Sequence, residues 1–159
     1  MKFQFNDGGR SEAGYKGHAG DCVARAIAIA TGRPYAEIYE ILAQGNFEQR
    51  KTKKSPKTAG KKTASHGISV KRKWFKDYMK SLGFTWVPCM KIGTGCKVHL
   101  TDGELPNGRL VVSVSGHYTC VIDQVINDTF NPERNIDWLM GDGSQYVQKR
   151  CVYGYYILN

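Results

Sequence analysis

The segment from Asp21 to Gly32, with the sequence DCVARAIAIATG, constrains the fold more than any other part of this 159-residue chain. Alanine is the strongest helix former, Asp21 suits the cap at a helix N-terminus, and Gly32 suits the position just after a helix end. The residues between them are small and apolar nearly all round the predicted helix. We therefore expect this helix to be buried centrally, with the rest of the chain packed around it.

A second helix is predicted directly after the first, with Pro34 near its first turn. Its apolar stripe consists of Tyr35, Ile38, Tyr39, Ile41 and Leu42. A third helix is predicted over about 69–82, where apolar and basic residues alternate with helical spacing.

From Phe84 onward the sequence changes to short β-like runs separated by turn residues. These runs cover 84–90, 109–115, 117–122, 125–130 and 145–158, the last with a break, and a short strand is predicted at 2–6. Helices first and strands afterwards predict an α+β fold, in which N-terminal helices pack on a C-terminal antiparallel sheet.

Length and composition are those of an ordinary globular protein. A chain of 159 residues predicts a single domain over 1–159, and its 41% of hydrophobic residues is an average content. The longest apolar run is Ala26–Ala30, which excludes a transmembrane helix, and residues 1–10 lack the apolar core of a signal peptide. Five cysteines without close pairing favour free thiols in a reducing, cytoplasmic compartment.

The net charge of +9 is concentrated in one part of the chain. Residues 50–80 hold twelve basic residues and one acidic residue, a net charge of +11, so the remainder of the chain carries −2. Residues 49–66 contain no large aliphatic or aromatic side chain, and we expect them to form a flexible loop that buries no surface.

This basic segment supplies candidates for binding nucleic acid or an acidic partner protein. The candidate residues are Lys51, Lys53, Lys54, Lys61, Lys62, Lys71, Arg72 and Lys73. Residues 50–66 lack the interleaved aromatic residues that stack on bases, so a solvated surface is the favoured interpretation over nucleic-acid binding.

Cys22 is the candidate nucleophile. It follows Asp21 at the first position of the predicted buried helix. Unpaired backbone N–H groups and the positive end of the helix dipole stabilise a thiolate there, and the thiolate is the reactive form. The alternative is a small buried residue without a chemical role.

His117 begins the predicted strand 117–122, which an Asp123-Gln124 turn separates from the next strand. With a two-residue loop, Ile122 pairs with Val125, His117 faces Phe130, and Asp128 lies diagonally on the same face as His117. A three-residue loop would instead bring Asn131 to that face. The pattern predicts His117 as a base and Asp128 as the residue that orients it.

Cysteine at a helix start, histidine 95 residues later and a carboxylate on the next strand resemble the papain-like cysteine peptidase superfamily. GDCVARAIAIATGRPYAEIY and GHYTCVIDQVINDTFNP look like small papain-like proteins of bacteriophages, and are also similar to bacteriocin-leader peptidases. The resemblance implies a papain-like fold with Cys22 as nucleophile, His117 as general base and acid, and Asp128 as orienting residue. It also implies a host or viral polypeptide as substrate, in the cytoplasm of a bacterial host cell, and no cofactor.

Papain-like enzymes usually carry a Gln about six residues before the cysteine, which donates to the oxyanion. This chain has Lys16 at that spacing, so Lys16 and His18 are the candidates for oxyanion donors.

Two alternatives to a peptidase remain open. A papain-like scaffold without catalytic activity would use the basic residues at 50–80 to bind nucleic acid or an acidic protein. An acyltransferase would use the same triad with an amine as acceptor. The spacing Cys89-x6-Cys96-x2-His99 is the weakest signal, because zinc sites usually have closer cysteine pairs and a fourth ligand, so we predict no metal.

Overall fold

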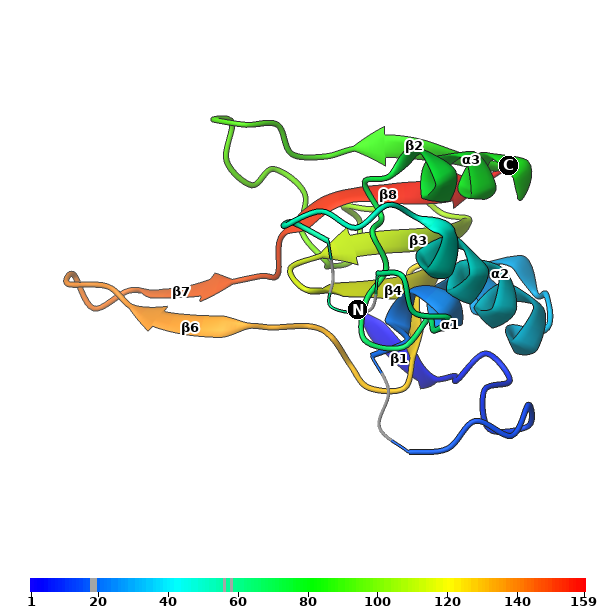
Figure 1. The fold of residues 1–159 in the computed structure, drawn as a ribbon. Helices are drawn as coiled ribbons and strands as arrows, with labels where there is room; N and C mark the ends of the chain where they lie inside the picture. The colour runs from blue at the N-terminus through cyan, green and yellow to red at the C-terminus, as the bar shows by residue number, and fades with distance from the viewer. Residues whose placement is uncertain (18–19, 56, 58) are drawn as a thin grey trace.

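The structure is a computed structural model, which describes residues 1–17, 20–55, 57 and 59–159. Its helices are α1 (Cys22–Thr31), α2 (Tyr35–Glu48) and α3 (Lys73–Ser81). Its strands are β1 (Lys2–Phe5), β2 (Phe84–Pro88), β3 (Arg109–Val114), β4 (His117–Ile122), β5 (Val125–Asp128), β6 (Ile136–Leu139), β7 (Gln145–Gln148) and β8 (Val152–Leu158). The helices lie beside a large sheet (Figure 1), so the α+β class is confirmed.

The large sheet has the strand order β1-β5-β4-β3-β8-β2. Its pairs are antiparallel except that β1 runs parallel to β5, with Lys2 opposite Val125. The expectation of a purely antiparallel sheet is therefore wrong. The reason is that β1 precedes the helices, and the long chain between β1 and β5 permits a parallel pair that a short hairpin would not.

Helix α1 occupies the centre of the molecule, as its sequence predicts. Every residue from Val23 to Ala30 is buried, and the helix packs mainly against β4. Gly32 ends it in the left-handed conformation (φ 70°) and donates its N–H to the carbonyl of Ala28 at 2.9 Å. Asp21 stands at the N-cap position, but its side chain makes no capping hydrogen bond.

The second and third helices differ in detail from the predictions. Within the stripe of α2, Tyr35, Ile38 and Leu42 are buried, whereas Ile41 is 40% exposed. Helix α3 begins at Lys73 instead of about residue 69, because Arg72 has an extended backbone (ψ 147°).

The turn between β4 and β5 has the predicted two residues. Ile122 pairs with Val125, and both Asp123 (φ 45°) and Gln124 (φ 69°) adopt positive φ, as a tight hairpin turn requires. The carboxylate of Asp123 accepts a hydrogen bond from the N–H of Gly108 at 2.8 Å. This turn fixes the register that places Asp128 relative to His117.

The described part of the segment 49–66 contains no helix or strand, but some of its residues pack against the core. Ala59 and Ala64 are buried, with Ala64 in the same core cluster as α1. The Asn46 side chain donates to the carbonyls of Thr63 (2.8 Å) and Gly67 (3.1 Å). The expectation that this segment buries no surface is wrong, because two small alanines suffice to anchor it.

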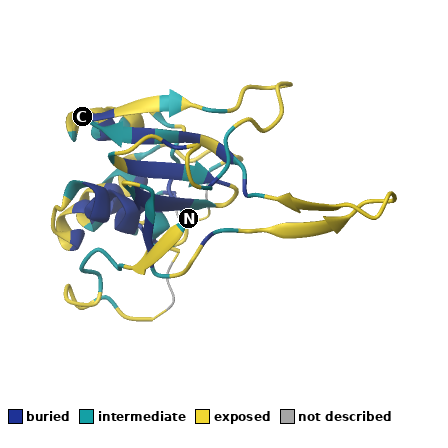
Figure 2. Cartoon of the chain, turned by 180° about the vertical axis from the view of Figure 1, so that it is seen from behind, coloured by how far each residue is buried: buried dark blue, intermediate teal, exposed yellow. Residues whose placement is uncertain are grey.

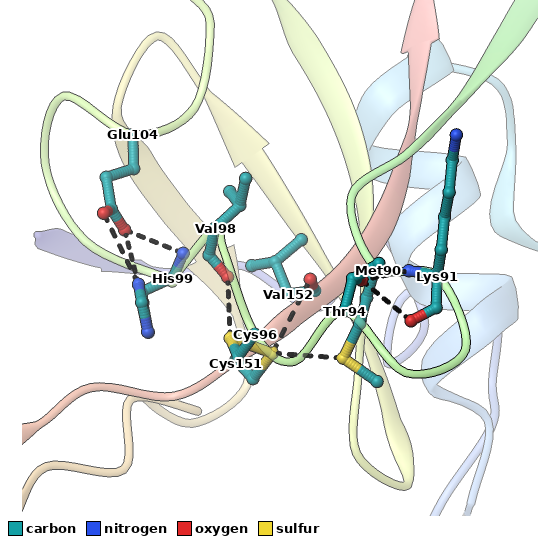
Figure 3. Close-up of a disulfide and its surroundings, with 9 residues drawn as sticks. All are labelled: Met90, Lys91, Thr94, Cys96, Val98, His99, Glu104, Cys151 and Val152. Atoms are coloured by element: carbon teal, nitrogen blue, oxygen red, sulfur yellow. Dashed lines mark hydrogen bonds and ion pairs between the residues drawn. A yellow bond between two sulfur atoms is a disulfide. The ribbon is translucent and has the colours of Figure 1, made fainter.

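Cys96 and Cys151 form a disulfide (Figure 3), so the prediction of five free thiols is wrong. The loop after β2 returns beside the start of β8, where the N–H of Leu100 donates to Arg150 and that of Val152 to Val98, both at 2.8 Å. The proximity arises from tertiary structure across 55 residues of sequence, which cysteine spacing does not reveal.

Two of the three residues proposed as zinc ligands have other partners in this loop. Cys96 is in the disulfide, and the Nδ1 atom of His99 lies 3.1 Å from a Glu104 carboxylate oxygen (Figure 3). Over the described part of the chain, no cluster of three or more His, Cys, Asp or Glu residues is placed to hold a metal ion.

Strands β6 and β7 form a separate hairpin that projects from the body of the molecule (Figures 1 and 2). All eight of its strand residues are exposed, including Trp138 and Tyr146, which lie opposite each other. Strand β6 is absent from the strands predicted from the sequence. Within the described residues, no helix has the length and apolar character needed to cross a membrane.

Candidate active site

The predicted site residues Cys22, His117 and Asp128 come together at one place in the fold. Cys22 is the first residue of α1, His117 the first of β4 and Asp128 the last of β5. Helix α1 packs against both β4 and β5, and this packing brings the helix N-terminus to the strand ends. The three side chains thus come from three different elements of one packed unit.

Asp128 and His117 are joined by a hydrogen bond of 2.8 Å between Oδ2 and Nε2. The same carboxylate oxygen accepts a hydrogen bond from Thr119 Oγ1 at 2.7 Å, and Oδ1 accepts one from the Thr129 N–H at 2.7 Å. Burial raises the pKa of Asp128, but the hydrogen bonds from His117 and Thr119 outweigh this effect, so the pKa lies below its usual value. Asp128 is therefore held as a carboxylate.

The His117 ring is fixed on a second side by Phe130, as the two-residue turn predicts. The ring centroids of the two residues are 5.0 Å apart. Asn131, the alternative orienting residue, instead accepts a hydrogen bond from the Glu133 N–H through its side-chain oxygen at 3.0 Å. The structure therefore places Asp128, and not Asn131, beside His117.

Cys22 and His117 lie close enough to shift each other's pKa. Burial raises the pKa of the Cys22 thiol, but its polar and charged neighbours lower it by more, to below its usual value. The largest lowering effects come from His117, through hydrogen bonding and charge, and smaller ones come from the N–H of Tyr118 and the charge of Arg25. Burial lowers the pKa of His117, but hydrogen bonds and charges of Asp128 and Cys22 raise it to about 9. The arrangement favours a thiolate–imidazolium pair at neutral pH.

Comparison of the chain with protein-family models, curated proteins and solved structures found no match.

Arg25 also belongs to the site, although it is not among the site residues predicted from the sequence. It lies one turn after Asp21 in α1, is 7% exposed, and forms an ion pair with the Asp21 carboxylate. Its Nη2 atom is also 3.6 Å from Asp128 Oδ1. The sequence does contain a feature that points to Arg25, because it is the one charged residue between Cys22 and Thr31 in a helix expected to be buried.

Asp21 anchors this buried charge network from the side of the N-terminal loop. Besides Arg25, it accepts a hydrogen bond from Arg10 Nε at 2.9 Å and one from the Tyr35 hydroxyl. These partners explain why the Asp21 carboxylate does not cap α1. They link the loop before α1, helix α1 and helix α2 to the carboxylate that holds His117.

The oxyanion candidates receive no direct support. Lys16 is exposed, and its backbone carbonyl accepts a hydrogen bond from Arg10 at 3.2 Å. Among the residues described, no hydrogen bond or ion pair joins the Lys16 side chain to Cys22 or His117. His18 lies outside the described residues.

The basic residues that are candidates for binding nucleic acid or an acidic protein are exposed, except for Arg72. Exposed members are Lys51, Lys53, Lys54, Lys61, Lys62, Lys71 and Lys73. Arg72 is half-buried, and its guanidinium donates to the carbonyl of Arg50 (2.9 Å) and to Ser55 Oγ (3.1 Å). Arg72 therefore holds the segment 50–55 in place, whereas the lysines extend into solvent.

Proposed function

We propose that this protein is a papain-like cysteine peptidase or a related amide hydrolase, with a polypeptide of the host or of a virus as its substrate. The observation that carries the proposal is the Cys22–His117–Asp128 arrangement, in which Asp128 holds the imidazole and the imidazole lowers the pKa of the thiol. Action in the cytoplasm of a bacterial host follows from the resemblance to phage proteins. The Cys96–Cys151 disulfide removes the argument from free thiols for that compartment.

The reaction begins with the thiolate of Cys22 attacking an amide carbonyl carbon. The carbonyl oxygen becomes an oxyanion, which the unpaired N–H groups of the first turn of α1 can bind. His117 then transfers its proton to the leaving amine, and the C–N bond breaks to leave a thioester on Cys22. Water, deprotonated by His117, attacks the thioester and releases the acid and the thiol.

Asp128 has a positioning role in this scheme. Its hydrogen bond engages Nε2, so Nδ1 is the ring nitrogen available for proton exchange with Cys22, and its charge stabilises the imidazolium. Thr119, the Thr129 N–H and Arg25 fix the carboxylate in turn. The orientation of the base therefore depends on contacts from both the sheet and α1.

Alkylation of the thiols by iodoacetamide, followed by peptide mass analysis, tests the proposal directly. We expect Cys22 to react much faster than Cys89 and Cys120, because burial raises the pKa of both of these other thiols. Activity on any amide or thioester substrate should disappear in Cys22→Ala. Equal rates at all three free thiols, or full activity of Cys22→Ala, would contradict the proposal.

A second candidate function is a scaffold without catalysis that binds a polyanion through the exposed lysines of 50–73. Binding to single-stranded or duplex nucleic acid should then weaken steeply as salt rises. An affinity that does not depend on salt would exclude it. Trapping of the acyl-enzyme with added amines would distinguish acyl transfer from hydrolysis.

A further inference from the structure

A large apolar groove lies between α3 and the strands β2, β3 and β8, on the face of the sheet that the helices cover. Its volume is about 820 Å³. The aromatic rings that line it are Phe84 and Trp86 of β2, Tyr118 of β4, and Tyr153 and Tyr156 of β8. Trp86 is 42% and Tyr153 38% exposed, so the groove offers aromatic surface to a ligand.

The shape of the groove depends on a glycine in β8. A Cβ atom at Gly154 would lie 2.4 Å from Cζ2 of Trp86, so only glycine lets the indole lie against this strand. The Trp86 ring also packs against Tyr156, with 4.8 Å between ring centroids. The aromatic floor is therefore preformed by packing within the sheet.

The groove begins next to the proposed nucleophile. Tyr118 directly follows His117 in β4 and lines the groove, and Cys22 packs against the core cluster that contains Tyr118. Val70 lines the groove too, and like Cys22 it packs against the core cluster around α1. A ligand lying in the groove would thus extend toward Cys22.

Three lysines stand along the groove, Lys71 before α3 and Lys76 and Lys80 on α3. All three are exposed, and within the described chain none forms an ion pair. No acidic residue lines the groove. Its wall therefore carries three positive charges without compensation beside an apolar floor.

We propose that this groove binds the substrate polypeptide through a segment of bulky apolar residues flanked by acidic residues. The inference rests on the proposed function, because that function makes a polypeptide the ligand next to Cys22. The aromatic floor takes the apolar side chains, and the lysines pair with the flanking carboxylates. The groove thereby selects acidic apolar sequences over basic ones.

The test measures peptide binding to Cys22→Ala by fluorescence anisotropy, so it needs no turnover. The probes are two labelled peptides, Gly-Asp-Leu-Phe-Glu-Gly and its basic counterpart Gly-Lys-Leu-Phe-Lys-Gly. We expect the acidic peptide to bind roughly tenfold tighter at low salt, from a few weak exposed ion pairs. The combined variant Lys71→Glu, Lys76→Glu, Lys80→Glu should lose this preference, and Trp86→Ala should weaken both peptides.

The matched control is the variant Lys53→Glu, Lys54→Glu, Lys57→Glu, which makes the same change of charge at exposed residues outside the groove lining. It should keep the preference for the acidic peptide. Equal affinity for the two peptides, or equal losses in the two triple variants, would overturn the assignment. Displacement of the acidic peptide by a single-stranded oligonucleotide, lost in the groove variant alone, would also overturn it in favour of a nucleic-acid site. If the acidic peptide is preferred but the wild-type protein cleaves no amide or thioester substrate, the proposed function is wrong and the assignment of the groove as a peptide-binding site is kept.

Discussion

Replacing Arg25 by methionine removes a cation that pairs with two buried carboxylates. Asp21 is 0% and Asp128 3% exposed, and Arg25 contacts both. Breaking a buried ion pair by removing one partner costs ~3–5 kcal/mol, because the other charge stays buried. Asp21 keeps Arg10 and Tyr35, and Asp128 keeps His117 and Thr119. We therefore expect the lower end, a loss of about 3 kcal/mol in the free energy of unfolding.

Arg33→Met is the matched control, since it removes the same side chain from an ion pair of the same spacing. Arg33 lies 3.0 Å from Glu37, but their side chains are 50% and 42% exposed. An exposed pair of this kind contributes roughly 0.3–0.5 kcal/mol. The contrast between the two variants isolates the effect of burial from the loss of an arginine.

The measurement is urea unfolding at pH 7 followed by tryptophan fluorescence, with linear extrapolation to zero urea. A domain of ordinary stability, ~5–15 kcal/mol, still folds after a loss of this size. A loss below about 1 kcal/mol in Arg25→Met, or one equal to that of Arg33→Met, would refute the reasoning.

Three further predictions concern the site, a helix contact and the disulfide. In Asp128→Asn the pKa of His117 should fall from about 9 and that of Cys22 should rise, so alkylation of Cys22 slows at pH 6.5 yet matches the wild type above pH 9. Gly45→Ala should destabilise the protein to urea by ~1–3 kcal/mol, although alanine favours helices, because its Cβ would lie 2.3 Å from Trp74. Cys151→Ser should lower the free energy of unfolding by roughly 4 kcal/mol through loss of a 55-residue loop closure, and added reductant should then have no further effect on stability.

The sequence predicted the parts of the site that depend on local rules. A two-residue turn at Asp123-Gln124 sets the pairing of β4 with β5, and that pairing alone places Asp128 and Phe130 beside His117. The apolar character of residues 23–30 predicted the burial of α1. Both predictions are correct because turn length determines strand pairing, and side-chain pattern determines helix burial, within a few neighbouring residues.

Features that depend on distant contacts were missed for the same reason. The disulfide joins cysteines 55 residues apart, and the parallel pairing of β1 with β5 crosses most of the chain. The position of Asp21 predicts a helix cap, but in the structure its carboxylate accepts hydrogen bonds from Arg10, Arg25 and Tyr35 instead. Tertiary partners of charged side chains are not encoded in the spacing of neighbouring residues.

Asp128 links the stability of the fold to the reactivity of Cys22. It accepts hydrogen bonds from His117 and Thr119 of β4 and pairs with Arg25 of α1, the helix that begins with Cys22. The charge that raises the pKa of His117 is thus the same charge that fixes α1 against the sheet. Arg25→Met should consequently slow alkylation of Cys22 at pH 6 as well as destabilise the fold, because Arg25 also helps to lower the pKa of that thiol. Arg33→Met should leave the alkylation rate unchanged, since the ion-pair partner of Arg33 is the exposed Glu37 of α2.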